Sequence, residues 1–154
     1  MAVARDNPYG AFNFLITADP INGGDGTTLR GGFQEISGLN MEVTVAEYRN
    51  GNEAENHTRK MNTLTKTGDV TLKRGVIGTL DLFNWIKRVR DGDQTARVNV
   101  TIEMLDETHE TPILKWKLTN ARPIKFTAPT FNAKTATDVA IEELVLSSEK
   151  LEME

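Results

Sequence analysis

Hydrophobic and polar residues alternate along several short stretches of this chain, which is the pattern of β-strands that cover one face and expose the other. The clearest stretch spans residues 96–104. Its apolar positions are Ala96, Val98, Val100, Ile102 and Met104, and its polar positions are Arg97, Asn99, Thr101 and Glu103. Residues 114–119 alternate in the same way after an acidic turn at 106–111, so these two stretches predict a β-hairpin.

Three further alternating stretches, at 12–16, 39–46 and 70–75, also predict strands. The strict alternation of 39–46 leads us to expect that one of its faces lies on the core and the other faces water. Pro123 and Pro129 interrupt the segment after the hairpin, where proline suits an edge or a corner better than a central strand.

The pattern changes to a helical period at about residues 79–91. The apolar stripe consists of Leu82, Phe83, Trp85, Ile86 and Val89, and the opposite side of Asp81, Asn84, Lys87 and Arg88. We expect Thr79 to cap the N-terminus, Gly92 to end the helix and the stripe to pack on a sheet. No other long helix is expected.

The last apolar run changes phase midway. Its apolar positions are Val139, Ile141, Leu144 and Leu146. A β-bulge near Glu142 and Glu143 would place all of them on one face, and we expect one there. The charged tail at 147–154 is expected to be loosely held.

Two stretches lack strand or helix periodicity. Residues 21–32 are rich in glycine and aspartate and predict an exposed loop. Residues 46–65 are polar and charged, and they predict a protruding loop or flexible hairpin. Together the elements predict a single domain over 1–154 that is mainly β: an antiparallel β-sandwich or barrel-like domain with one flanking α-helix.

Composition narrows the function. The chain has 154 residues, a net charge of −4 and no cysteine. Its basic residues are scattered, which argues against a specific nucleic-acid site, and it has no cysteine for disulfides or Cys-ligated metals. The N-terminal residues lack the apolar core of a signal peptide, so we expect synthesis and assembly in the cytoplasm.

Candidate chemistry is sparse. Asp106, Glu107, His109 and Glu110 carry metal-ligating atoms, but an exposed hairpin turn does not easily converge them on one ion. The neighbours Glu142 and Glu143 suggest acid–base chemistry, but adjacent strand residues point to opposite faces. We therefore expect no catalytic, cofactor-binding or metal-binding residues and no enzymatic activity.

A family resemblance is carried by motifs that occur in order along nearly the whole chain. They are NPYGAFNF, GGFQEISGLN, YRNG, VTLKRGV, LFNWIKRV, VTIEMLDE, WKLTNARPIKF and FNAKTATDVAIEEL. In these motifs the chain resembles the inner tube (tail tube) proteins of contractile-tailed phages, and particularly those of phage-like extracellular contractile injection systems. Type VI secretion tube proteins share the expected fold but not these motifs.

The resemblance implies a structural role. Hexameric rings would stack into a hollow tube, which contraction of a surrounding sheath drives through a target envelope. The implied partners are further copies of the chain, the sheath protein, the baseplate with its spike and tube-initiator proteins, and a tube terminator or cap. Protein cargo would travel in the lumen, or DNA in a phage, and the particle would be released outside the cell.

The resemblance also suggests which residues meet which surroundings. The lumen candidates are Arg97, Asn99, Thr101 and Glu103. The candidates for an inter-ring loop are Tyr48, Arg49, Asn50, Glu53, Glu55, His57, Arg59 and Lys60. Two other interpretations stay open: the tail tube of a contractile-tailed phage or prophage, and a soluble monomeric module that binds a ligand through the loop at 48–62.

Overall fold

A computed structural model describes residues 4–19, 32–134 and 137–154, so most of the loop expected at 21–32 lies outside the described residues. The described part is mostly antiparallel β-structure with one helix, α1 (Asp81–Arg90), as the alternation predicts. The strands are β1 (Phe14–Ala18), β2 (Glu35–Ser37), β3 (Met41–Tyr48), β4 (Arg59–Thr67), β5 (Val70–Gly75), β6 (Val98–Leu105), β7 (Pro112–Thr127), β8 (Ile141–Ser147) and β9 (Lys150–Met153). No helix in the described ranges is long and apolar enough to cross a membrane.

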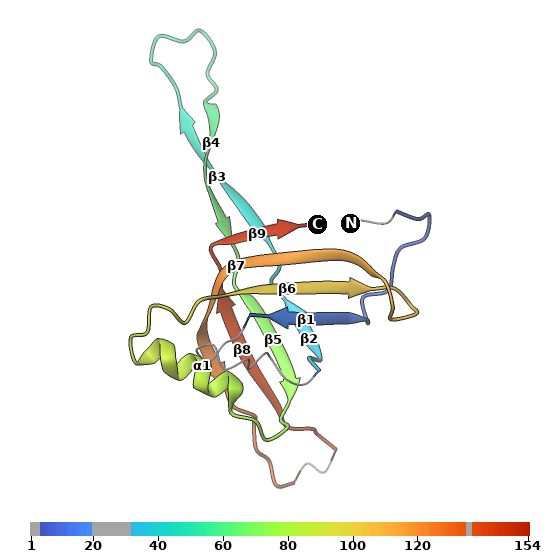
Figure 1. The fold of residues 1–154 in the computed structure, drawn as a ribbon. Helices are drawn as coiled ribbons and strands as arrows, with labels where there is room; N and C mark the ends of the chain where they lie inside the picture. Colours follow the sequence, from blue (N-terminus) through green and yellow to red (C-terminus); the bar gives the residue numbers. More distant parts are fainter. Residues whose placement is uncertain (1–3, 20–31, 135–136) are drawn as a thin grey trace.

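The long strand β7 joins two sheet regions. Its first part pairs with β6 and β9, and its second part, from Arg122 on, pairs with β8. The strand order is β1-β6-β7-β8-β5-β2, with β9 added on β7. Strands β1, β6, β7 and β9 cross the steeper β5 and β8 in Figure 1. Pro123 lies at the change of partner, where the register shifts, so the predicted corner is confirmed.

The core lies between these regions and α1. Its fully buried members include Val70 and Leu72 of β5, Val100 of β6, and Leu144 and Leu146 of β8. The apolar face predicted for 96–104 is thus confirmed over most of its length, because Ala96, Val98, Val100 and Ile102 belong to this cluster. Trp85 of α1 is completely buried, and its indole N–H donates to the carbonyl of Ala96 at 2.8 Å, which fixes the helix against the start of β6.

The helix begins later than expected. Its N-cap residue is Leu80, which makes no side-chain capping bond, so the prediction of Thr79 as the N-cap is wrong. The Thr79 hydroxyl instead donates to the Asp81 carboxylate at 2.8 Å. Asp81 is buried rather than on the outer side of α1, because its carboxylate binds the Arg74 guanidinium at 2.5 Å.

Arg74 also explains why the bulge expected in β8 is absent. Strands β5 and β8 pair in unbroken register from Val70 opposite Leu146 to Gly75 opposite Ile141. Glu142 therefore takes an inward position, where its carboxylate binds Arg74 at 2.7 Å. Burial lowers the pKa of Arg74, but the hydrogen bonds that its guanidinium donates to Asp81 and Glu142 raise the pKa above its ordinary value.

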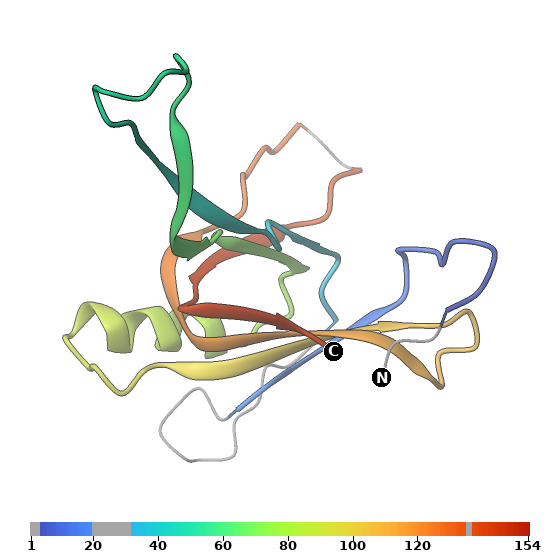
Figure 2. The same cartoon turned by 90° about the horizontal axis from the view of Figure 1, so that it is seen from above.

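Strands β3 and β4 form a separate two-stranded hairpin that projects from the body (Figures 1 and 2). The segment 46–65, expected as a protruding loop or flexible hairpin, contains the end of β3 and most of β4, and the connecting tip spans 49–58. The prediction that 39–46 lays one face on the core is wrong: Met41, Val43 and Val45 are 60%, 44% and 47% exposed.

The charged tail at 147–154 contains the strand β9. The residues of β9 pair with β7 from Trp116 opposite Met153 to Thr119 opposite Lys150, so the expectation of a loosely held tail is also wrong. Leu151 packs against the core, although no alternating pattern in the preceding residues predicts a strand there.

Candidate assembly surfaces

The first candidate surface is the outer, polar face of the sheet region formed by β1, β6, β7 and β9. On β6, Glu103 lies between Lys115 of β7 and Leu15 of β1. Two residues earlier, Thr101 lies between Lys117 of β7 and Thr17 of β1. Three of the four lumen candidates, Asn99, Thr101 and Glu103, thus share this face, and Arg97 lies directly before β6. The side chain of Asn99 also accepts the backbone N–H of Asn120 at 3.2 Å, at the place where the register shifts.

Charges on this polar face are largely compensated by neighbours. Lys115 lies 3.2 Å from Glu103, and Arg97 lies 3.3 Å from Glu149. Lys117 forms an ion pair with Glu154, which raises the pKa of Lys117 and lowers that of Glu154. The face is therefore well hydrated without a strong charge of either sign.

Sequence reasoning missed part of this face. Lys115 and Lys117 were recognisable from their alternation with Leu114 and Trp116. Lys150 and Glu152, which form an ion pair at 2.5 Å, were not, because they belong to the unpredicted strand β9.

The second candidate surface is the β3–β4 hairpin, which carries all of the predicted inter-ring residues. At its tip, Arg49 donates to the backbone carbonyls of Glu53 and Glu55 at 3.1 Å, and Arg59 binds the Glu53 carboxylate at 2.7 Å. His57 lies 3.1 Å from the carboxylate of Glu55. Several charged side chains that were expected to contact a neighbouring ring thus form hydrogen bonds and ion pairs within the tip itself.

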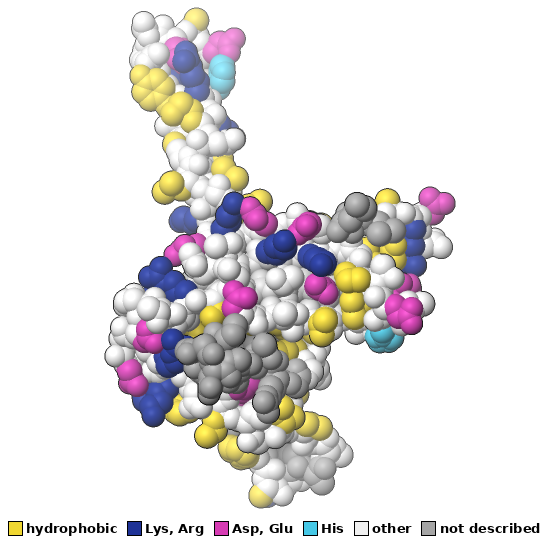
Figure 3. Space-filling view, viewed as in Figure 1, with side chains coloured by type: hydrophobic (Ala, Val, Ile, Leu, Met, Phe, Trp, Pro, Cys, Tyr) yellow, Lys and Arg dark blue, Asp and Glu magenta, His cyan; other side chains and the backbone are white. Residues whose placement is uncertain are grey.

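Apolar side chains of the hairpin are exposed on both of its faces, and Figure 3 shows hydrophobic atoms along the side in view. The register places Met41, Val43 and Val45 on one face, and Met61 and Tyr48 on the other. Met61 and Tyr48 are about half exposed, at 52% and 53%. A projection of this kind is typical of a surface that another chain covers.

The third candidate surface is a groove between α1 and β7, here called the helix groove, with a volume of about 620 Å³. Its lining consists of Phe83, Ile86, Lys87, Val89, Arg90, Arg122, Pro123, Ile124 and Phe126. Phe83 and Phe126 meet edge to face at 6.2 Å between ring centres. Phe83 was expected in the covered stripe of the helix, yet it is 41% exposed at this groove.

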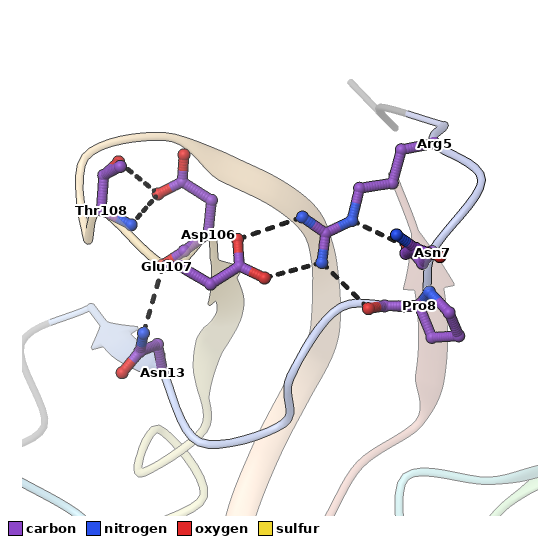
Figure 4. Close-up of polar contacts among 7 residues, drawn as sticks. All are labelled: Arg5, Asn7, Pro8, Asn13, Asp106, Glu107 and Thr108. Atoms are coloured by element: carbon purple, nitrogen blue, oxygen red, sulfur yellow. Dashed lines mark hydrogen bonds and ion pairs between the residues drawn. The ribbon is translucent and has the colours of Figure 1, made fainter.

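Hydrogen bonds organise the acidic turn at 106–111 (Figure 4). The Asp106 carboxylate accepts the hydroxyl and the backbone N–H of Thr108, and these bonds lower the pKa of Asp106. Glu107 receives both terminal nitrogens of Arg5, at 2.6 and 3.2 Å, which lowers the pKa of Glu107. Across the described residues, no three acidic or histidine side chains are grouped to hold a metal.

Comparisons with known proteins show to which family the chain belongs. No curated protein is similar to the chain. A chain in the cryo-EM structure of an extracellular contractile injection system, the PVC sheath–tube complex in its extended state, superposes with a TM-score of 0.81 at 26% identity, over 97% of this chain and 93% of that one. A chain of the anti-feeding prophage baseplate, 6-fold symmetrised, gives a TM-score of 0.82 at 26% identity, over 97% of both chains.

A more distant likeness concerns the fold alone. Hcp1 from Flavobacterium johnsoniae superposes with a TM-score of 0.51 at 16% identity, over 90% of this chain and 94% of that one.

The family model of the T4-like virus tail tube protein gp19 matches residues 10–152, which is almost the whole chain. The chain therefore belongs to the T4-like tail tube family and is a structural tube protein.

Proposed function

We propose that this tube protein forms hexameric rings that stack into the hollow inner tube of a contractile injection system, which sheath contraction drives through a target envelope. The similar chains come from structures described as a sheath–tube complex, a 6-fold symmetrised baseplate, a tube terminator and a tube terminating cap. We infer the same partners here: a sheath, a baseplate with its spike and initiator proteins, and a cap. The chain acts as a conduit and catalyses no reaction.

The observation that carries this proposal is the polar face of the sheet region ordered β1-β6-β7-β9. Its terminal strands β1 and β9 each leave one edge without a strand partner among the described residues. Edges of this kind pair readily with other strands, and a heterologous contact repeated around a rotation axis closes a ring. The polar faces of six copies would then line a hydrated channel, while each copy keeps its apolar core.

In this arrangement Arg97, Asn99, Thr101 and Glu103 face the lumen. The compensated charges of this face favour passage over capture, because a mobile cargo is not held by a wall of one charge. Protein cargo fits this lumen, and in a phage DNA would pass without a specific binding site.

The projecting hairpin supports the stacking of rings. The apolar residues on both of its faces are exposed in the single subunit, so their burial would stabilise the tube only when neighbouring copies cover them. We place the residues Tyr48, Arg49, Asn50, Glu53, Glu55, His57, Arg59 and Lys60 at the contact between successive rings. Particles assembled in the cytoplasm would carry the finished tube out of the cell.

Negative-stain electron microscopy of the purified, untagged protein over a concentration series tests this proposal. We expect six-fold rings and hollow stacks of uniform diameter. A variant lacking Asn52 to Thr58 tests the hairpin, and we expect it to form rings that do not stack. Normal tubes from this variant would contradict the inter-ring role.

The same experiment separates the alternatives. Persistent monomers at every concentration, together with the absence of the protein from assembled particles, would favour the soluble binding module. Genes for a sheath and baseplate beside this one, without capsid genes, would favour an injection system over a phage tail.

A further inference from the structure

We propose that the acidic turn of one copy docks into the helix groove of the next copy, so that subunits associate end to end. This inference rests on the proposed tube assembly and names a contact within it. It uses the helix groove and the acidic turn, neither of which the lumen or the hairpin contact requires.

The helix groove combines an apolar floor with a basic rim. Phe83, Ile124 and Phe126 form the floor, and Phe83 and Ile124 are 41% and 49% exposed. Lys87 and Arg122 stand at the rim, and among the described residues neither has a carboxylate at salt-bridge distance. The third rim cation, Arg90, lies 3.6 Å from Asp91. The groove therefore fits an acidic segment that brings apolar side chains.

Such a segment is present at the other end of the same sheet. Asp106, Glu107 and Glu110 of the acidic turn lie beside the N-terminal segment that Arg5 clasps to Glu107. Phe12, two residues before β1 in this region, is 71% exposed. This end thus offers carboxylates together with an exposed aromatic side chain, which is the complement of the groove.

The two surfaces lie at opposite ends of β6 and β7, as Figures 1 and 2 show: α1 is at one end and the β6–β7 turn at the other. Surfaces placed in this way cannot meet within one copy, but they can meet between copies. The contact is heterologous, because the two partners contribute different surfaces, and such a contact repeats along a ring or a stack.

Charge favours a second copy as the occupant. The chain carries a net charge of −4, yet its groove presents Lys87, Arg90 and Arg122 together. Opposite local charges bring the two ends of separate copies together, and like charges would repel them. The acidic turn is also a stiff ligand, since hydrogen bonds already hold Asp106 and Glu107.

Charge reversal on each surface tests the contact. One variant carries Lys87→Glu with Arg122→Glu. The other carries Glu110→Lys of the turn with Asp6→Lys, an exposed residue next to Arg5 in the adjoining N-terminal segment, and so spares Asp106 and Glu107, which organise the turn. Each variant alone should raise the concentration needed for association about tenfold or more, measured by sedimentation velocity at low salt. A 1:1 mixture should associate again, because each groove then meets a turn of opposite charge.

The matched control is Lys134→Glu with Asp138→Lys, two exposed residues of the β7–β8 connection, and it should associate like the unmodified chain. Unchanged association of both reversed variants, with normal tubes, would overturn the docking contact and leave the proposed tube function standing. Loss of association that mixing does not repair would also overturn it.

Cross-linking between single-cysteine variants detects the docking contact even if rings do not close. The chain has no cysteine, so Phe12→Cys and Ile124→Cys variants each carry a single thiol. We expect a disulfide or a short bismaleimide link between the two variants when mixed, and little linkage within either alone. Val139→Cys replaces Ile124→Cys as the control. Linkage without tubes would support the contact and count against the tube function, and no mixed linkage would overturn the contact.

Discussion

Strands β3 and β6 carry almost the same pattern but lie in opposite surroundings. Each has eight residues in which branched apolar side chains alternate with polar ones. In β6, Val100 and Ile102 are 0% and 3% exposed, whereas in β3, Val43 and Val45 are 44% and 47% exposed. Alternation therefore specifies a strand with one apolar face, but not which chain covers that face.

This difference divides the stability of the protein into two parts. Burying a valine or isoleucine side chain contributes about 1.5–3 kcal/mol, so the apolar face of β6 stabilises the single subunit. In β3, Val43 and Val45 stay nearly half exposed in the single subunit, so they add little of this free energy to its folding. In the proposed assembly they would contribute it once another copy covers the hairpin.

The largest expected effect compares Val100→Asp with Val43→Asp. An unpaired carboxylate in the core should cost about 3 kcal/mol or more, which is a large part of the stability of a small domain. At Val43 the carboxylate stays in water, so the melting temperature of the subunit should hardly change while tube formation is lost. Circular dichroism melts and electron microscopy measure the two outcomes. Equal losses of melting temperature would break the distinction between body and hairpin.

An effect of similar size on the subunit, without a direct effect on assembly, is expected when Arg74→Met is compared with Arg59→Met. Arg74 neutralises Asp81 and Glu142 in the core, so removing it leaves two buried carboxylates and should cost about 3–5 kcal/mol. The Arg59 pair with Glu53 at the hairpin tip is partly exposed, and its loss should cost less than about 1 kcal/mol. Urea titrations of both variants check this ratio. A loss at Arg59 as large as that at Arg74 would show that the hairpin is not an independent projection.

The smallest effect concerns Asp93, after the helix. Bonds from the hydroxyl and backbone N–H of Thr95, together with Arg88, lower the pKa of Asp93 from 3.8 to about 2. A lowered pKa stabilises the folded protein above pH 3.8, and this contribution disappears as the pH falls to about 2. Asp93→Asn should therefore lower the melting temperature slightly at neutral pH, and the difference should vanish near pH 2. A difference that persists unchanged in acid would exclude the carboxylate as its cause.

The sequence alone predicted the parts of the molecule in which one local rule decides the structure. The hairpin of β6 and β7 follows from alternation around a turn, and α1 follows from a stripe that includes Leu82 and Trp85. Both elements are confirmed because their apolar residues meet the core of the same chain. The family motifs carried the prediction of a tube protein, which no single residue could have indicated.

The missed features depend on partners distant in sequence. Asp81 and Glu142 look like surface residues, and only their meeting with Arg74 places them inside. Strand β9 has a highly charged sequence, and it forms because β7 offers an edge for it. Met41, Val43 and Val45 of β3 stay exposed although they alternate as buried strand residues do, so alternation alone could not have predicted their surroundings.

Strand β7 has a mechanical consequence. Because it passes from one sheet region into the other at Pro123, a force applied to β6 or β9 reaches β8 along covalent backbone rather than through side-chain contacts alone. Sliding the two regions apart would have to shear hydrogen bonds on both sides of this strand at once. A subunit built in this way would transmit force along the tube as a single stiff element, as the proposed passage through a target envelope requires.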